Sequence, residues 1–436
     1  MKIAFISLNR EKLPDPVIPV GILYIIANTP EHHQKELWDL CFEDKPKDFL
    51  RSKIGSFNPE VIAVGIRNVN NNSYTGIEDN LNYYKSIFSE IRSLTKSKII
   101  LGGSGFSIMS EEIMQFLKPD LGIFGEGEET FNSVLETLED RRGDFSQIPN
   151  VLYFNDNKLE VNKRSNNFVD INSIKKPAIE YLVSDYFDFM GINSIQTKRG
   201  CTYNCKYCSY PKIEGNICRL RTPSKVAEEI RSCQEQCGNI NHFFIVDSVF
   251  NSPAEHAKQI CRELIDANLK TPWTCYCNPI DFDEELAELM SEANCRGVEI
   301  GADSGNNKIL QKLHKGFDTT AILNISKLCK KNGIKDCHTF MLGTPDETIE
   351  DVKITLEFIE ELKPFCSIIM PWFSYDMASD KPKTHNSILE MLKQYSKTKN
   401  NCIIPCLNKN FDQKLFKFLR KKNFQGPLWY HIDLVL

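Results

Sequence analysis

The chain has 436 residues, of which 41% are hydrophobic and 25% charged, and its formal net charge is −5. These values are ordinary for a globular protein and exclude an overall basic character of the kind that marks nucleic-acid binding. A chain of this length predicts two or three domains.

Two further absences bear on location. The sequence has no run of about 18 apolar residues that would span a membrane, and Met1 to Leu8 lead directly into a strand-like segment without the features of a signal peptide. We therefore expect a cytoplasmic protein with no membrane partner. In a reducing compartment its 16 cysteines would serve as metal ligands, catalytic groups or small core residues.

Residues 1–145 alternate short apolar runs with amphipathic segments. Strands are predicted at 2–8, 36–40, 60–66, 98–102 and 120–124, with helices at 83–94 and 111–117 among the intervening segments. This alternation predicts an α/β domain whose parallel sheet is covered on both faces, that is, a doubly wound domain. Ligands of such sheets bind beyond the carboxyl ends of the strands. Three of those ends are rich in Gly or Asn, and they read Arg67-Asn68-Val69-Asn70-Asn71-Asn72, Gly102-Gly103-Ser104-Gly105 and Gly125-Glu126-Gly127-Glu128.

Residues 146–190 form a predicted connector with a small hairpin at 151–161, around Asn155-Asp156-Asn157. A second βα series follows over 191–375, with strands at 194–198, 242–246, 273–277, 297–301, 337–342 and 366–370. Six strands are too few for a closed eight-fold barrel, so we predict an open, partial (β/α)6 barrel with its chemistry at the carboxyl ends.

Helix starts in this series are predicted at Thr222-Pro223, Ser252-Pro253-Ala254-Glu255 and Thr344-Pro345-Asp346-Glu347. Residues 376–436 form a less regular C-terminal extension. Its amphipathic segment, 411–419, ends in Arg420-Lys421-Lys422, which we interpret as a helix C-terminus.

Three cysteines, Cys201, Cys205 and Cys208, lie within eight residues of one another directly after the first strand of the second series. Three thiolates on a four-iron cluster leave one iron open to an exogenous ligand, whereas a fully ligated cluster needs a fourth cysteine and suits electron transfer. The alternatives are a zinc site or three core thiols. Zinc would normally take a fourth Cys or His at finger-like spacing, and the next cysteine is Cys218, ten residues further on.

A Cys-x-x-x-Cys-x-x-Cys loop after the first strand of a partial barrel resembles the radical S-adenosylmethionine (SAM) superfamily. The resemblance implies that the open iron of a 4Fe–4S cluster binds SAM, which is then cleaved to a 5′-deoxyadenosyl radical. It also implies that Tyr207 lies near the adenine, and that the segments 297–305 and 340–347 contact SAM through Glu299, Ser304 and Gly343. Within the first of these segments Ala302-Asp303 departs from the usual Glu-Ser-Gly run.

Asp247, after the second strand of the series, is a further candidate SAM contact. It would bind ribose or a substrate amine. The alternative is a charge at a helix N-terminus.

A doubly wound domain ahead of such a barrel resembles the cobalamin-dependent branch of the superfamily. The resemblance covers nearly the whole chain and includes Pro19 to Tyr24 at the start of the first helix. It implies that cobalamin contacts come from the glycine-rich strand ends, where a large planar ligand approaches the backbone closely. These contacts are Arg67, Asn68, Gly102, Gly103, Ser104, Gly105, Gly125, Glu126 and Gly127. Gly102 to Gly105 do not match the six-residue dinucleotide fingerprint, which disfavours nicotinamide binding.

Many cobalamin domains carry a histidine that ligates cobalt, in the motif Asp-x-His-x-x-Gly. The loop after the first strand has no histidine here, and His32 and His33 are predicted to lie on the surface. Ile66-Arg67-Asn68 instead resembles a subgroup that includes a tryptophan methyltransferase, in which an arginine lies beneath the cobalt. The alternative for Arg67 is a loop arginine paired with an acid.

The remaining cysteines are assigned mainly to the core. Cys233 and Cys237 lie at helical spacing with Val226 and Ile230, as does Cys329 with two isoleucines. Cys275 and Cys277 share one face of a strand, which leaves a core or a cavity position open. Cys402 and Cys406 form a weak candidate for a second cluster.

The resemblance implies C-methylation of an unactivated carbon, with a 4Fe–4S cluster, SAM and cobalamin as cofactors. A close resemblance to the tryptophan subgroup would imply methyl transfer that bypasses hydrogen abstraction. Two alternatives are ring formation or rearrangement with the same cofactors, and a cobalamin- or redox-sensing binding module. The implied partners are a small-molecule or peptide substrate and an electron donor such as a flavodoxin or ferredoxin; the oligomeric state stays open.

Overall fold

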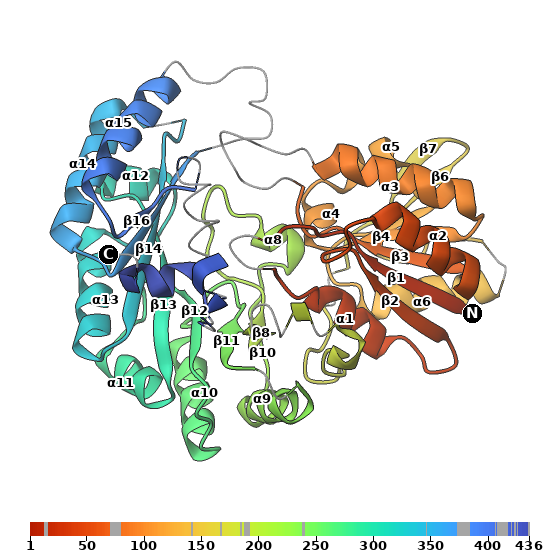
Figure 1. Cartoon of the computed structure of the whole chain (residues 1–436), viewed down its shortest axis with the longest axis horizontal. Coiled ribbons are helices and arrows are strands. Elements are labelled where there is room, and N and C mark those ends of the chain that lie inside the picture. Colours follow the sequence, from red (N-terminus) through yellow and green to blue (C-terminus); the bar gives the residue numbers. More distant parts are fainter. Residues whose placement is uncertain are drawn as a thin grey trace.

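The structure is a computed structural model and describes residues 1–12, 16–69, 80–140, 143–165, 168–183, 185–186, 192–237, 240–345, 347–372, 384–405, 407, 417–419, 421–422, 424 and 426–434. Within them the chain forms two α/β units that lie side by side, the first in red to yellow and the second in green to blue (Figure 1). Each unit is built on a 7-stranded sheet.

The first unit has the strand order β2-β1-β3-β4-β5-β6-β7, in which β1 to β5 run parallel. The five predicted strands and the two predicted helices are confirmed. Its elements are β1 (Lys2–Ser7), α1 (Val20–Asn28), β2 (Gln34–Asp39), α2 (Pro46–Phe57), β3 (Val61–Gly65), α3 (Asn80–Leu94), β4 (Lys98–Gly102), α4 (Ser104–Ile108), α5 (Ser110–Leu117), β5 (Leu121–Ile123), α6 (Glu128–Glu139), β6 (Val151–Asn155) and β7 (Lys158–Val161).

The strands of this sheet are apolar on both faces, because helices cover both faces. Successive residues of a strand point in opposite directions. Phe5 of β1 therefore packs in one buried cluster with Leu23 of α1, and its neighbour Ile6 packs in another with Leu50 of α2 and Ile87 of α3. A strand buried on both sides reads as a continuous apolar run, which is the pattern of the sequence at β1 and β3.

The predicted hairpin is confirmed and extends the first sheet. β6 pairs antiparallel with β5, and β7 with β6. Asp156 and Asn157 between the two strands have φ values of 47° and 67°. Two successive positive φ angles are those of a type I′ turn, which Asp and Asn tolerate better than most residues.

The second unit has seven parallel strands that follow one another in chain order, β8 and then β11 to β16. The six predicted strands are confirmed, and β16 is an addition of only two residues. The elements from the connector onward are η1 (Ile179–Tyr181), β8 (Ile192–Ile195), β9 (Lys198–Arg199), α8 (Tyr210–Ile213), β10 (Arg219–Leu220), α9 (Pro223–Cys237), β11 (His242–Ile245), α10 (Ala254–Asp266), β12 (Trp273–Cys277), α11 (Glu284–Glu292), β13 (Cys295–Asp303), α12 (Asn307–Lys312), α13 (Thr319–Lys331), β14 (Lys335–Leu342), α14 (Ile349–Leu362), β15 (Cys366–Pro371), α15 (Thr384–Thr398), β16 (Cys402–Ile403) and η3 (Leu428–Leu434).

The predicted helix starts had mixed outcomes. Thr222-Pro223 does open α9. Ser252 does not cap α10, which begins at Ala254 after Pro253, because the Ser252 hydroxyl bonds the Tyr203 side chain instead.

The start expected at Thr344 lies later in the chain. The Glu347 carboxylate turns back to accept the N–H groups of Gly343 and Thr344. Helix α14 then begins after Thr348, which forms a capping box with Asp351. Glu347, which the sequence pattern placed in the first turn of a helix, thus stabilises the exit of β14.

Several expectations fall outside the described residues. They concern Asn70, Asn71, Asn72, Asp346, Cys406, Arg420 and residues 411–416. The side chain of Cys237 is likewise not described.

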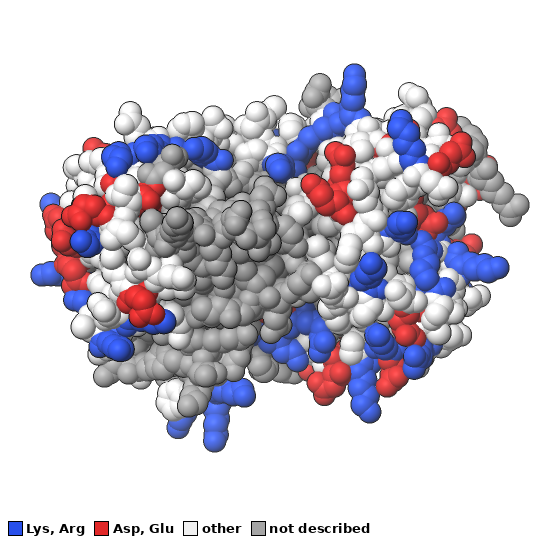
Figure 2. All heavy atoms as spheres, turned by 90° about the horizontal axis from the view of Figure 1, so that it is seen from above, with Lys and Arg blue, Asp and Glu red and all other residues white. Residues whose placement is uncertain are grey.

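The described helices include none with both the length and the apolar character to cross a bilayer. On the face seen in Figure 2, basic and acidic side chains are interspersed over both units. This distribution agrees with the absence of a basic signature in the composition.

Candidate functional site

The carboxyl ends of the two sheets meet between the units. Helix α4 follows β4 of the first sheet, and it packs against α8, which follows the cysteine loop of the second unit. Both helices lie at the junction of the two units in Figure 1. The ligand edge predicted for the first sheet therefore faces the cysteine loop.

The cysteine loop runs from the end of β9 to α8. Gly200 opens it with a φ of 83°, and a Cβ there would lie 2.1 Å from the Ile217 carbonyl oxygen, so only glycine fits. Within the loop the Cys208 N–H donates to the Cys205 carbonyl at 3.1 Å. The Lys206 N–H donates to the Leu313 carbonyl at 3.1 Å and thereby ties the loop to the end of α12.

All three cysteines of the loop are free thiols, Cys201 buried and the other two half-buried. Burial raises the pKa of Cys205 and Cys208, and both thiols are close enough to Cys201 to be affected by its charge. Three unpaired thiols gathered on one turn of loop fit a cluster that needs three protein ligands.

A side-chain clamp fixes the loop to the carboxyl end of β13. The Tyr207 hydroxyl donates to the Asp303 carboxylate. Lys315 Nζ lies 2.7 Å from the same carboxylate and 3.2 Å from the Tyr207 hydroxyl. Asp303 adopts a φ of 62°, which is uncommon for a residue with a side chain, and the clamp holds it there. Asp303 is the residue that departs from the family run, and Lys315 carried no sequence signal at all.

Two of the candidate SAM contacts are engaged inside the protein. The fully buried Asp247 carboxylate accepts the N–H and hydroxyl of Thr197 and the Lys198 N–H. The fully buried Ser304 hydroxyl bonds Thr355 at 3.0 Å and accepts the Asn306 N–H. Burial raises the pKa of Asp247, in spite of the lowering effect of Lys198. Both side chains are thus engaged within the protein, and their contact with SAM stays a prediction.

The other candidates are placed differently. Gly343 has a φ of 84°, and a Cβ there would lie 2.9 Å from the Ile388 side chain, so glycine is required at the exit of β14. Glu299 lies on the inner face of β13, where it accepts the Trp429 indole N–H at 2.6 Å. Tyr207 is about one-third exposed, with its hydroxyl held by the clamp.

Arg67 lies at the exit of β3 and faces the second unit. Burial lowers the pKa of its guanidinium, and the groups that act on it next are Tyr276, Tyr210, Tyr186 and Tyr84. Tyr276 and Tyr210 belong to the second unit, and Tyr210 directly follows the cysteine loop. The Arg67 side chain is nevertheless exposed.

The backbone at Arg67 is fixed from two sides. The Ser104 hydroxyl donates to the Arg67 carbonyl at 3.2 Å, and the Tyr84 hydroxyl donates to the Asn68 carbonyl at 2.7 Å. A Cβ on Gly105 would lie 2.7 Å from the Arg67 carbonyl oxygen. The sequence reasoning attributed the glycines of this edge to close approach of a ligand. At Gly105 the approach is that of the chain itself.

The same explanation extends to the other glycines of the edge. A Cβ on Gly103, whose φ is 101°, would lie 2.5 Å from the Ile66 carbonyl oxygen. On Gly127 it would lie 3.0 Å from Ile25, and on Gly125 3.3 Å from Arg164. Only at Gly102 is the nearest atom as far as 3.6 Å.

Glu126, a predicted cobalamin contact, belongs to a buried ion-pair network between the units. Its carboxylate accepts from Arg199 at 3.0 Å and from Arg219 at 2.7 Å. Arg199 also pairs with Glu128 at 2.7 Å and lies over the Tyr24 ring. The side chains of Glu126 and Arg199 are each only 8% exposed. This network joins the exit of β5 to the residue two positions before Cys201.

Most of the remaining described cysteines lie in the core, whereas Cys218 is half-buried. Cys233 and Cys329 are buried among helix residues. Cys275 and Cys277, 3.7 Å apart at sulfur, belong to the same cluster as Cys261 of α10, so they face the helices and not a cavity. Cys402 is buried.

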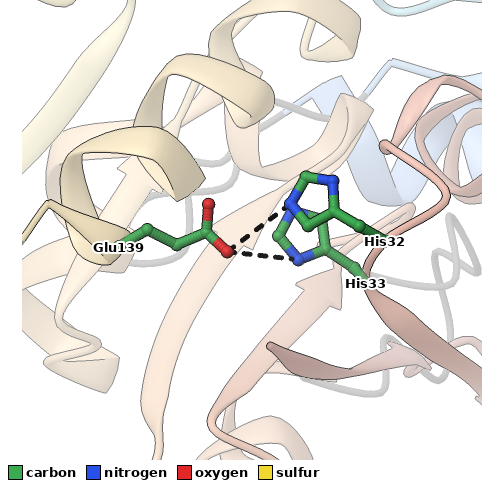
Figure 3. A group of neighbouring side chains, drawn as sticks. All are labelled: His32, His33 and Glu139. Atoms are coloured by element: carbon green, nitrogen blue, oxygen red, sulfur yellow. Dashed lines mark ion pairs between the residues drawn. The ribbon is translucent and has the colours of Figure 1, made fainter.

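His32, His33 and Glu139 come together at the amino end of β2, as Figure 3 shows. His32 is exposed, as expected, but His33 is 4% exposed, which corrects its predicted surface position. The amino group of Met1 lies 3.1 Å from His33 Nδ1 and 3.8 Å from the Glu139 carboxylate. A cationic group thus already lies among these side chains, at the sheet edge opposite the cysteine loop.

The comparisons with known proteins agree with this geometry. The family model "Radical SAM superfamily" matches residues 195–359. The chain is 25% identical over 348 residues to an uncharacterized methyltransferase of Pyrococcus horikoshii, with 79% of this chain and 73% of that protein covered. It is also 25% identical over 431 residues to the tryptophan 2-C-methyltransferase of Streptomyces laurentii, with 81% and 70% covered.

Two solved structures share the fold. The radical S-adenosylmethionine methyltransferase TsrM from Kitasatospora setae, solved with cobalamin and a 4Fe–4S cluster bound, superposes with a TM-score of 0.76 at 23% identity over 85% of this chain and 72% of that one. The cobalamin-dependent radical enzyme OxsB, with aqua-cobalamin bound, has a TM-score of 0.70 at 16% identity over 95% and 56% of the chains. Residues 195–359, which carry the cysteine loop, are thus a domain of the radical SAM superfamily.

Proposed function

We propose that this chain is a cobalamin-dependent radical SAM C-methyltransferase acting on an unactivated carbon of a small molecule. The observation that carries the proposal is the meeting of the two carboxyl edges, where Arg67 of the first unit faces Tyr210 at the end of the cysteine loop. A curated relative and a structural neighbour that are methyltransferases support the same reaction class. In this proposal the first unit is a doubly wound cobalamin-binding domain and the second an open, partial barrel.

Each unit has its own task in the reaction. Cys201, Cys205 and Cys208 hold the cluster, and the Tyr207–Asp303–Lys315 clamp keeps their loop at the end of β13. The edge formed by Arg67 and residues 102–105 receives the cobalamin. When bound, the cluster with SAM supplies a carbon radical and the cobalamin supplies a methyl group. The protein orients the substrate between them and excludes water, and an electron donor such as a flavodoxin or ferredoxin reduces the cluster.

Arg67 has a specific role in this arrangement. A guanidinium is always protonated and has no lone pair to give, so it cannot coordinate a metal. At the edge that would hold the cobalamin, Arg67 would therefore supply no ligand to the cobalt. The lowered pKa of Arg67, caused by burial, does not change this, because its ordinary value lies far above neutrality.

The test compares Cys205→Ser with Cys218→Ser after anaerobic reconstitution with iron, sulfide and cobalamin. Wild type and Cys218→Ser should each hold about four irons per chain, form 5′-deoxyadenosine from SAM on reduction, and add one CH2 unit to the substrate mass. Cys205→Ser should lose both the iron and the 5′-deoxyadenosine. Equal loss of iron in the two variants would contradict the ligand assignment, and substrate turnover without a mass gain would favour ring formation or rearrangement.

The same preparation tests Arg67 by electron paramagnetic resonance. The cob(II)alamin-loaded wild type should show no nitrogen splitting from a lower ligand, and Arg67→His should introduce one. Nitrogen splitting in the wild type would refute the proposed role of Arg67.

A further inference from the structure

The inner face of the second sheet, which points away from its helices, changes character along the strands. Its residues alternate with those packed on the helices, such as Val298 and Ile300 of β13. Toward the carboxyl ends this face is open, since Met370 on β15 is 39% exposed. Closer to the amino ends, Tyr276, Glu299 and Cys337 form one row across β12, β13 and β14, and in this row Tyr276 is 36% exposed whereas Cys337 is fully buried.

The C-terminal segment η3 closes the amino-end half. Trp429 and Ile432 of η3 pack in one buried cluster with Cys337, Cys366 and Ile403. The dark blue C-terminal end of the chain lies against β13 and β14 in Figure 1. Outside the cluster, Lys335 of β14 donates to the Tyr430 carbonyl at 2.9 Å.

Trp429 is the deepest residue of this closure, and β13 is shaped to receive it. A Cβ on Gly297 would lie 2.5 Å from the Trp429 ring, so the indole occupies the space that the glycine leaves. Two residues further along the strand, Glu299 accepts the indole N–H at 2.6 Å. Trp429 is 3% exposed, whereas Glu299 is half-buried and lies at the boundary between the closed and open halves.

Glu299 also acts on the open half. Its charge is the largest cause of the raised pKa of Tyr276, which places the carboxylate and the phenol close to each other. The carboxylate that Trp429 holds therefore lies in the same row as Tyr276, where the exposed part of the inner face begins.

We propose that Trp429 forms the floor of the substrate cavity, and that its bond to Glu299 sets how deep a substrate enters from the carboxyl ends of the strands. Trp429 is then a specificity-determining residue, which limits the enzyme to substrates short enough for the half of the barrel above Glu299. This inference rests on the proposed function, since it places the substrate on the open inner face. Glu299, expected to contact SAM, belongs to this floor instead.

Cys337, which packs with Trp429 in the buried cluster, provides a readout that needs no turnover. The cluster-loaded full chain is treated with N-ethylmaleimide, and labelling of Cys337 is followed by peptide mass. In the wild type Cys337 should be protected. In Trp429→Ala it should be labelled at least tenfold faster, and added indole, which refills the space of the lost ring, should restore the protection.

Trp38→Ala is the matched control. Trp38 is also fully buried, and its indole also donates to a glutamate, Glu36, at 2.8 Å, but it lies in the first unit. A general loosening of the protein would expose Cys337 in both variants, whereas the floor predicts exposure only in Trp429→Ala. Gly297→Ala is a second variant, which displaces the ring without removing it and should also speed the labelling.

The proposal for Trp429 would be contradicted if Cys337 were labelled as slowly in Trp429→Ala as in the wild type. It would also be contradicted if Cys337 were labelled as fast in Trp38→Ala as in Trp429→Ala. Formation of 5′-deoxyadenosine by the same preparation is measured separately. Its absence in a wild type that still shows the labelling pattern would count against the proposed function and leave the floor standing. Formation of 5′-deoxyadenosine without the expected labelling pattern would count against the role of Trp429 alone.

Discussion

The two carboxyl edges that meet at the site contain charged side chains with different kinds of partner. In the second unit, Asp303 pairs with Lys315 and Asp351 with Lys308. At the first edge Glu126 is paired with arginines, but Arg67 has tyrosines as its main neighbours, and Asp39 accepts hydrogen bonds from the Cys41 N–H and the Tyr186 hydroxyl. Paired charges thus fix the clamp that holds the cysteine loop, whereas Arg67 and Asp39 have no opposite charge among the groups that act most on them.

The largest expected effect concerns Glu126, where the two edges are joined. Glu126→Gln removes a buried carboxylate and leaves Arg219 without its acidic partner. Removal of one member of a buried ion pair costs about 3–5 kcal/mol of unfolding free energy. Chemical denaturation should therefore show a lower midpoint. The matched control is Glu129→Gln, an exposed position at the start of α6, three residues further along the chain. Equal midpoints for the two variants would mean that the joint contributes no stability.

Asp39 tests the first edge, where its carboxylate has no cationic partner among the described residues. Burial raises its pKa to about 6 from an ordinary value of 3.8. Between these two values the folded chain binds more protons than the unfolded chain, so stability falls as pH rises through this window. The loss amounts to about 3 kcal/mol at one pKa unit per 1.36 kcal/mol. Asp39→Asn should remove this pH-dependent loss, so the variant should gain on the wild type in denaturation midpoints between pH 4 and pH 7. A constant difference across that range would show that Asp39 is compensated after all.

Asp351 tests the second edge, where a cationic partner shifts the carboxyl pKa in the opposite direction. Burial would raise its pKa, but hydrogen bonds from Thr348 and the Lys308 ammonium lower it to about 2. This stabilisation is fully present above pH 4 and is lost as pH falls through the folded pKa. Asp351→Asn should cost about 2 kcal/mol at neutral pH, close to the loss of a helix cap. The cost should shrink toward pH 2, as thermal unfolding at several pH values would show. A cost that does not vary with pH would assign the effect to packing.

Local patterns predicted much of the molecule. The strands and the cysteine loop follow from apolar runs and ligand spacing over a few residues, and they lie where expected. Sequence reasoning missed the features that join distant residues. Glu126 and Arg199 are far apart in the chain, as are Glu299 and Trp429. In neither pair does the local sequence around one residue indicate its partner. The glycines show a subtler limit. Their positions at the strand ends were expected, but Gly103 and Gly105 are required mainly by contact with the chain itself, which only the fold reveals.

The junction at Arg199 has a consequence for how the two units are positioned. Arg199 stands two residues before Cys201 and is bound to two acids of the first unit. Separation of the two units would break these buried ion pairs and would also displace the cysteine loop. The ion pairs of Arg199 therefore couple the relative position of the two units to the position of the cysteine loop.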